Sequence, residues 1–172
     1  MKKLIILLAF IVVPMATSAQ SFFDSLEDID GVDMVVVNKD MFELLSKFKP
    51  EKLKDNKAMQ VFEMIKDLNS LKVFSTDNKS IAEKMDFIVG KAIKSQNLTE
   101  LMRIKEDDSR IKIYVKSTKN KDFVSEVLMF IKDVDKKTKG TLDAKIVSLT
   151  GNIDINKMSD LADTFTNGKS KK

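Results

Sequence analysis

The sequence predicts an α+β domain: an antiparallel β-meander of about five to six strands, with helices packed on one face. In residues 110–116, apolar and polar residues alternate, which is typical of a half-exposed antiparallel strand. In residues 81–93, apolar residues recur every three or four positions, which is typical of an amphipathic helix. Short turn-like segments separate the apolar runs of the second half, which favours hairpins.

The first strand and helix are expected between residues 34 and 48. Residues 34–37 are four consecutive apolar residues, three of them β-branched, and indicate a buried strand. The apolar residues that follow have helical spacing: Met41, Leu44, Leu45 and Phe48. We expect the strand to turn into the helix at Asn38 and Pro50 to end that helix.

Two more amphipathic helices are predicted, with a short strand at residues 71–74 between them. The earlier helix has the apolar set Ala58, Val61, Phe62, Ile65 and Leu68. The later helix is expected to open at a capping box formed by Ser80 and Glu83. Its buried stripe is expected to be Ile81, Met85, Ile88, Val89, Ala92 and Ile93. Core filling is the default interpretation of methionines on such stripes, and a flexible binding groove is the alternative.

The second half of the chain is expected to be mostly strands. Residues 101–105 and 110–116 read as a hairpin joined through the turn-like sequence EDDS. The second strand places Ile111, Ile113 and Val115 on one face, and Arg110, Lys112, Tyr114 and Lys116 on the other. Residues 123–134 fit a helix by their spacing, but their β-branched and aromatic content leads us to predict a strand. Residues 141–155 contain the last strand.

The segment GNIDINKMSDLADTF, residues 151–165, is either a phosphate or ion loop or a strand passing into a helix. A phosphate loop needs more glycines or a Gly-Lys-Ser/Thr ending, and neither is present. We therefore expect Gly151 to permit a bulge or a close backbone approach, and Asn156 to cap a closing helix. That helix would bury Met158, Leu161, Ala162 and Phe165.

The N-terminus predicts export. Lys2 and Lys3 precede an apolar core at residues 4–13, then Pro14 and small residues ending in Ala19, which is the pattern of a signal peptide at residues 1–19. The apolar core is too short for a membrane span, which needs about 20 apolar residues. We expect a soluble periplasmic or extracellular protein with no integral membrane span after cleavage. It would comprise a single domain at residues 20–166 and a disordered basic tail at residues 167–172.

Charge and composition exclude several classes of function. The net charge is +4, and removal of Lys2 and Lys3 leaves 28 basic against 26 acidic residues, so nucleic acid is not an expected partner. The chain has no histidine and no cysteine, which removes Ser-His-Asp and Cys-His triads and thiolate zinc sites. Carboxylate pairs, Asp107 with Asp108 and Asp133 with Asp135, lie in lysine-rich turns and are read as solvated.

A partial calcium motif lies before the first strand. In the sequence DIDGVD, Asp28, Asp30 and Gly31 match part of a calcium loop, but Leu26 and Val37 stand at its two end ligand positions. We interpret the segment as a turn that enters the first strand. The sequence therefore predicts no catalytic, cofactor-binding or metal-ligating residue, and no cofactor.

Two longer motifs carry a family resemblance. They are LMRIKEDDSRIKIYVKS and, after another apolar strand and a turn, VSLTGNIDINKMSDLA. On these motifs the chain resembles the domain of unknown function 4252 family of exported Bacteroidetes proteins. The resemblance runs from about Met34 to Phe165 and contributes no catalytic residue. It implies an accessory role in envelope signalling, beside extracytoplasmic-function sigma-factor systems.

Three function classes follow. The leading hypothesis is a non-enzymatic domain that binds a protein of the cell envelope. The rival is a periplasmic carrier that encloses a small apolar ligand among Phe and Met side chains. The third is an enzyme built on carboxylates or lysine. In addition, Asp24–Leu26 resembles a short O-glycosylation acceptor, which makes Ser25 a candidate modification site.

Overall fold

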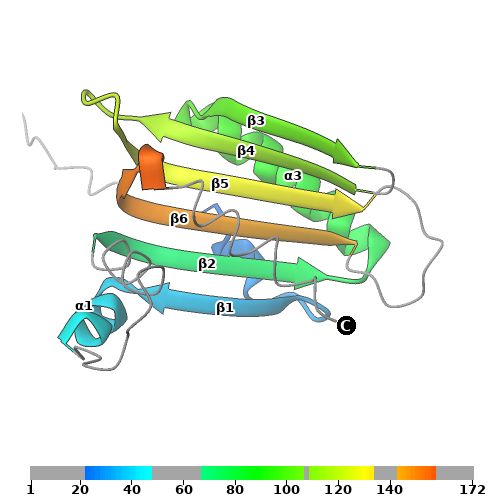
Figure 1. Ribbon diagram of the computed structural model, residues 1–172. Coiled ribbons are helices and arrows are strands. Elements are labelled where there is room, and N and C mark those ends of the chain that lie inside the picture. The colour runs from blue at the N-terminus through cyan, green and yellow to red at the C-terminus, as the bar shows by residue number, and fades with distance from the viewer. Residues whose placement is uncertain (1–21, 48–66, 107–108, 134–142, 158–172) are drawn as a thin grey trace, which may run out of the picture.

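The fold is a single antiparallel sheet of six strands (Figure 1). The structure is a computed structural model, which describes residues 22–47, 67–106, 109–133 and 143–157. Its strands are β1 (Asp33–Asn38), β2 (Leu68–Thr76), β3 (Thr99–Glu106), β4 (Ser109–Ser117), β5 (Phe123–Asp133) and β6 (Ala144–Asp154). Its helices are α1 (Lys39–Lys47) and α3 (Lys79–Gln96), with 3-10 turns η1 (Asp24–Leu26) and η2 (Ile155–Lys157).

The strand order is β1-β2-β6-β5-β4-β3, and every neighbouring pair is antiparallel. Strands β3 to β6 form a meander, and β6 then pairs with β2, which leaves β1 and β3 at the two edges. The predicted α+β class is therefore confirmed. The strand prediction for residues 123–134 is also confirmed, because β5 lies inside the sheet between β4 and β6.

Helix α3 and turn η1 pack on one side of the sheet, which we call the α3 face (Figure 1). The buried side chains there include Phe23, Leu26, Phe74, Met85, Leu128 and Ile146. Fully burying one such side chain contributes about 1.5–3 kcal/mol. The largely buried Lys72 of β2 fixes η1 in place, because its ammonium contacts Asp24 and lies 3.0 Å from Glu27. Burial opposes the charge on Lys72, but these two carboxylates outweigh it and raise the pKa of Lys72.

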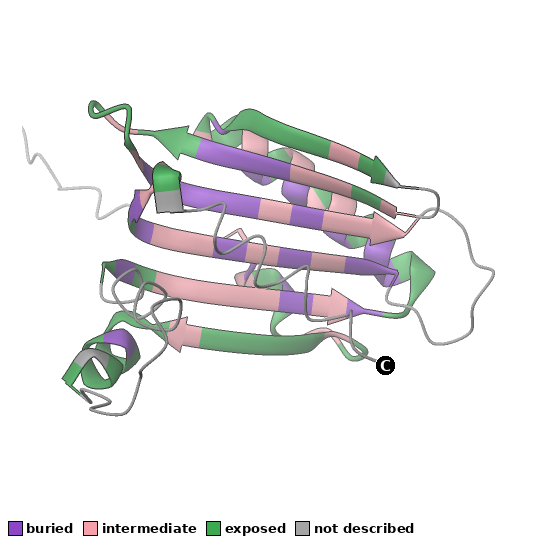
Figure 2. Ribbon diagram, in the orientation of Figure 1, coloured by how far each residue is buried: buried purple, intermediate pink, exposed green. Residues whose placement is uncertain are grey.

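The opposite side of the sheet also carries a cluster of buried apolar side chains. In Figure 2 the central strands are mostly purple and pink, which marks buried and intermediate residues. Its buried residues are Phe42, Leu68, Ile113, Val115, Val124, Val127 and Ile153. Because both faces carry apolar side chains, β5 reads as a nearly continuous apolar run and not as an alternating one. One expectation is wrong for the same reason. The alternating pattern of β4 predicts an exposed Tyr114, but Tyr114 is buried beneath α3.

The first strand is present as predicted, but the expectation that it is buried is wrong. Met34, Val35 and Val36 are exposed, because β1 is an edge strand with only β2 beside it among the described residues. The helix predicted after this strand is present as α1, but the apolar residues that predicted it do not form its buried side. Phe42 is its buried residue, and Met41, Leu44 and Leu45 are exposed. Phe48 and Pro50 lie outside the described residues.

Side chains at the helix starts decide where α1 and α3 begin. The predicted turn from strand to helix at Asn38 is confirmed, since Asn38 Oδ1 accepts a hydrogen bond from the Met41 amide at 3.1 Å. The capping box at Ser80 is a wrong prediction. Asn78 is the N-cap of α3, and its side chain accepts from the amides of Ser80 and Ile81 at 2.9 and 3.3 Å.

The helix predicted from Ala58 falls almost entirely outside the described residues, as does the closing helix of residues 158–165. The described end of the former, Leu68, begins strand β2, so the helix cannot extend to that residue. At the end of β6, the strand gives way to η2 after Asp154. There the side chain of Asp154 accepts a hydrogen bond from the Asn156 amide at 2.9 Å. The predicted cap at Asn156 concerns amides outside the described residues and stays a prediction. The predicted signal peptide and the predicted basic tail also lie outside the described residues.

The predicted close approach at Gly151 is confirmed. Gly151 has φ +148°, and a Cβ at this position would lie 2.4 Å from the carbonyl oxygen of Asp67 and 2.7 Å from the Cα of Leu68. The β2–β6 register shifts at the same point, between Leu68 and Ser70. A glycine is therefore needed where β6 crosses the start of β2.

We predict that Gly151→Ala lowers the free energy of unfolding by about 1–3 kcal/mol, because it combines a strained φ with a backbone clash. Gly90→Ala is the matched control. Gly90 lies in α3, and a Cβ added there would meet no neighbouring atom of the described residues within 4 Å, so alanine should stabilise by about 0.5–1 kcal/mol. Urea denaturation of the three proteins measures both effects, and equal stability of Gly151→Ala and wild type would contradict the assignment.

Candidate functional site

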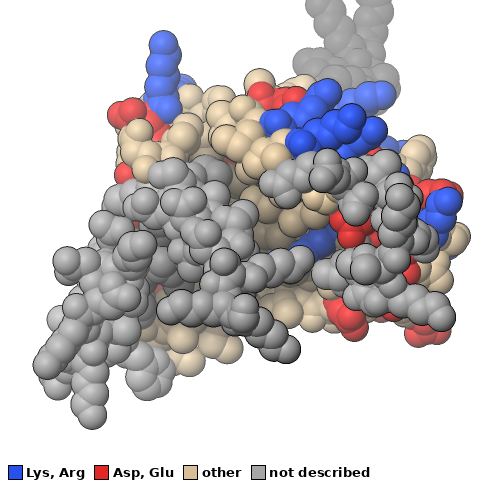
Figure 3. Space-filling model, turned by 45° about the vertical axis from the view of Figure 1, so that its right-hand side comes forward, with Lys and Arg blue, Asp and Glu red and all other residues tan. Residues whose placement is uncertain are grey.

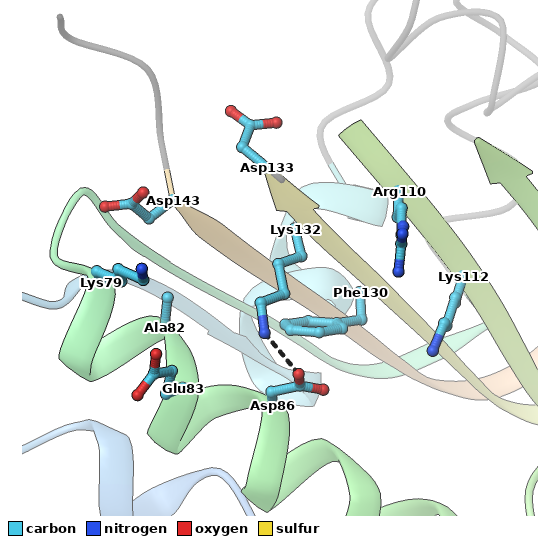
Figure 4. Close-up of a pocket in the computed structure, with 10 residues that line it drawn as sticks. All are labelled: Lys79, Ala82, Glu83, Asp86, Arg110, Lys112, Phe130, Lys132, Asp133 and Asp143. Atoms are coloured by element: carbon cyan, nitrogen blue, oxygen red, sulfur yellow. Dashed lines mark hydrogen bonds and ion pairs between the residues drawn. The ribbon is translucent and has the colours of Figure 1, made fainter. Parts of the chain in front are cut away.

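The α3 face contains a charged cleft between the first half of α3 and strands β4 and β5 (Figure 4). Its volume is about 310 Å³, at the lower end of ordinary ligand pockets. It is lined by Lys79, Ala82, Glu83 and Asp86 of α3, Arg110 and Lys112 of β4, Phe130, Lys132 and Asp133 of β5, and Asp143. The four α3 residues share one side of the helix because they are spaced by three or four positions.

The strand register brings cations together on the floor of this cleft. Arg110 lies directly between Lys105 of β3 and Lys132 of β5, so three cations stand in one row across three strands. In the next row, Lys112 lies between Arg103 and Phe130. Cross-strand partners share a face of the sheet, so these side chains are neighbours on the α3 face. Figure 3, which brings this end of the sheet forward, shows Lys and Arg side chains gathered there.

Carboxylates neutralise only part of this cationic cluster. Lys132 Nζ donates to Asp86 Oδ2 at 2.7 Å, which ties β5 to α3. On the edge strand, Arg103 donates to Glu100 at 2.7 Å. That hydrogen bond, with a smaller contribution from Lys112, holds the pKa of Glu100 below its ordinary value. The side chains of Arg110 and Lys112 form neither a hydrogen bond nor an ion pair within the described part of the chain.

Backbone hydrogen bonds fix the other end of the cleft. The amide of Asp143 donates to the Thr76 carbonyl at 2.9 Å, and the amide of Asp133 donates to the Asp143 carbonyl at 3.1 Å. Asp143 is thereby held at the junction of β2, β5 and β6. Figure 4 shows Asp143 and Lys79 at the opposite end of the cleft from Arg110 and Lys112. The cleft is therefore positively charged along β4 and mixed in charge at the start of α3.

One carboxylate on the α3 face is strongly buried, but it does not line the cleft. Burial raises the pKa of Glu126, against a smaller opposing effect of Lys116. With the Gln96 amide turned so that its nitrogen faces this carboxylate, Gln96 donates to Glu126 Oε1 at 2.7 Å and to Oε2 at 3.2 Å. Glu126 therefore has a structural partner at the end of α3, outside the group of charges that converge in the cleft.

The residues singled out in the sequence are scattered over the structure. Ser25 is exposed on η1, and its hydroxyl lies 3.5 Å from the Phe22 carbonyl, a long hydrogen bond. Gly31 has φ +87° in a turn before β1, as predicted, and its carbonyl accepts from Thr76 Oγ1 at 2.7 Å. Asp133 lines the charged cleft, whereas Asp107, Asp108 and Asp135 lie outside the described residues.

Sequence reasoning missed the cleft because it treated the polar face of β4 as solvated. The available signal was the alternation of Arg110, Lys112 and Lys116 with apolar residues, together with the lysine of β5 at residue 132. Those positions become a site only once the register and the position of α3 are known.

A second feature lies at the opposite edge of the sheet. We call it the β1–α1 apolar surface, and it consists of Met34, Val35, Val36, Met41, Leu44 and Leu45. These side chains are 40–56% exposed. They belong to the edge strand and to the helix that directly follows it, as Figure 2 shows by the green colour of both elements.

Comparison with known proteins identifies the family of this chain. Residues 25–161 match the family described as "Domain of unknown function (DUF4252)". The chain belongs to the DUF4252 family. The match spans the whole described sheet from β1 to β6, so the family domain is the fold described above. No curated protein and no solved structure matches the chain. None of the described helices of this DUF4252 protein is long and apolar enough to cross a membrane.

Proposed function

We propose that this DUF4252 protein is an exported, non-enzymatic domain that binds a partner protein of the cell envelope through its β1–α1 apolar surface. The observation that carries the proposal is the exposure of six large apolar side chains on one edge strand and its adjoining helix. The register places Val35 on the opposite face of the edge strand from Met34 and Val36, so exposed apolar side chains flank the edge on both faces. Large exposed apolar surface of this kind marks interaction sites in folded proteins.

The edge strand suits one kind of occupant, an extended segment of the partner. Strand β1 has the sequence DMVVVN, without the proline or lysine that edge strands use to prevent further pairing. A partner segment could add to β1 as a seventh strand, with main-chain hydrogen bonds supplying affinity. The exposed Met41, Leu44 and Leu45 of α1 would then contact apolar side chains of that segment.

Export and an envelope location rest on the N-terminal sequence, with its two lysines, its apolar core and its small residues up to Ala19. An accessory role in envelope signalling would agree with a domain that recognises another protein. For such a role, the domain needs a binding surface and no catalytic group of its own.

A carrier of a small apolar ligand is the second proposal. An open hollow of about 490 Å³ beside η1 and α3 is lined partly by Ile29, Phe87 and Ile88, which favours it. Phe87 is 64% exposed, and a ligand there would keep much of its surface in water. A bound apolar molecule in native mass spectra of the purified protein would support the carrier, and its absence would favour the partner-binding domain.

We predict that Val36→Lys weakens partner binding at least tenfold, equivalent to about 1.4 kcal/mol, because it places a charge in the centre of the pairing edge. Leu101→Lys is the matched control. Leu101 is similarly exposed, but it lies on β3 at the other edge of the sheet. The partner is first identified in envelope extract by photo-crosslinking through a probe at Met41. Its affinity for each variant is then measured by surface plasmon resonance, with the variant immobilised.

A partner that crosslinks equally through a probe at Leu101, or that binds Val36→Lys as tightly as wild type, would contradict the assigned surface. Light scattering decides whether the occupant is another protein. A homodimer that Val36→Lys dissociates would show that a second copy of the chain covers the edge, and it would overturn the proposal of a partner protein.

Intact mass of the protein from its native source tests export and the Ser25 proposal together. We expect a chain that begins at Gln20, with additional glycan mass that Ser25→Ala removes. Ser25 is accessible for such a modification because it is exposed on η1. A mass that includes residues 1–19 would contradict export, and the bare mass of the cleaved chain would rule out the glycan.

A further inference from the structure

A row of cations crosses the floor of the charged cleft, and the described carboxylates offset only part of their mutual repulsion. Lys105, Arg110 and Lys132 are direct cross-strand neighbours in one row. Like charges placed directly opposite each other on neighbouring strands are destabilising. Asp86 compensates Lys132 at 2.7 Å, but Arg110 and Lys112 have no ion-pair partner among the described residues.

We propose that the charged cleft is a binding site for a small organic anion. Arg110 and Lys112 would hold its carboxylate or phosphate group, and the ring of Phe130 would contact its carbon skeleton. This site lies on the β4–β5 side of the sheet, far in strand order from the β1–α1 apolar surface, and it does not depend on the partner proposed above.

The chemistry of the two cations selects an oxyanion. The guanidinium of Arg110 offers a planar pair of donors that matches carboxylate and phosphate oxygens, and Lys112 adds a mobile point charge beside it. Both extend into the cleft toward α3 from one face of β4, being two residues apart (Figure 4). A bound oxyanion would neutralise the two charges that the described part of the protein leaves without an ion-pair partner.

The walls of the cleft limit the size and the charge of the rest of the ligand. A volume of about 310 Å³ lies at the lower end of ordinary ligand pockets, so the cleft suits a small molecule. Phe130 lies in the same row as Lys112 and supplies an apolar wall between Lys112 and Lys132 (Figure 4). At the far end, the two carboxylates of Glu83 and Asp143 outnumber the one cation described there, Lys79, which disfavours a second anionic group on the ligand.

Other cations on the α3 face show what a purely structural role looks like. Arg103 bonds to Glu100 at 2.7 Å, and Lys72 contacts both Asp24 and Glu27. Each of these cations meets a carboxylate that offsets its charge. Arg110 and Lys112 differ from them in pointing into a cavity, with the neighbouring carboxylate Asp86 already bonded to Lys132.

Nuclear magnetic resonance titration of the protein, residues 20–172, tests this site with three matched probes at constant ionic strength: glycerate, glycerol 3-phosphate and glycerol. We expect at least one anion to shift the backbone amides of β4 and β5 around Arg110 and Lys112, and neutral glycerol to leave them unmoved. A response to glycerate alone would assign a carboxylate ligand, and a response to glycerol 3-phosphate alone would assign a phosphate ligand. No saturable shift with either anion would overturn the proposal.

Variants separate a specific site from general charge. Arg110→Gln and Lys112→Gln should each weaken binding of the responding anion at least tenfold. Lys145→Gln should change it less than twofold, because Lys145 is next to the cleft in register but belongs to the opposite face of β6. Equal weakening by Lys145→Gln would show non-specific attraction and overturn the site.

Thermal unfolding of the same variants without ligand checks whether Arg110 has a structural role instead. Removing one of three opposed cations relieves repulsion, so Arg110→Gln should unfold at the same temperature as wild type or a higher one. A clear loss of stability in both Arg110→Gln and Lys112→Gln would contradict the assignment of these side chains to ligand binding.

Discussion

Gly151 lies so close to the backbone of Asp67 and Leu68 that no side chain fits between the start of β2 and the end of β6. This contact fixes the register of the strand pair that joins two parts of the sheet, the β1–β2 edge and the β3–β6 meander. A slip of one residue would turn every side chain of a strand to the other face. The positions of Phe74 and Ile146 beneath α3 therefore depend on the backbone fit at Gly151.

The same register determines which side chains are exposed toward the two edges of the sheet. Because β6 pairs with β2, the hairpin-like pair β1–β2 is added outside the meander and β1 becomes an edge. Because β4 lies between β3 and β5 in the observed register, Arg110 meets a cation on each side. The β1–α1 apolar surface and the charged cleft thus lie toward opposite edges of one sheet, and α3 and the central strands support both.

The sequence predicted the elements whose signal is local. Helix α3 follows from the spacing of its apolar residues, and β5 follows from its β-branched and aromatic content despite helical spacing. Gly151 was identifiable because glycine at the end of an apolar strand indicates close backbone approach. The exposure of β1 was not predictable in this way, since an edge position depends on pairing between β2 and β6, which are about 75 residues apart.

The candidate site was even less visible in the sequence. Arg110 and Lys112 have the pattern of a solvated strand face, and only the position of α3 above that face makes them part of a cleft. In α1, the buried residue is Phe42 and not the residues whose spacing predicted the helix. The helix meets the sheet at its edge, where one large side chain reaches the apolar face and its neighbours remain exposed.

Strand β6 organises the sheet and leaves β1 at one of its edges. Amide hydrogen exchange of the isolated monomer, residues 20–172, tests this arrangement most directly, because protection follows the local free energy of opening. We expect β5 and β6 to contain the slowest amides, and we expect the amides of the two edge strands, β1 and β3, that point away from their partner strands to exchange fastest. Protection of all β1 amides equal to that of β6 in the monomer would contradict it.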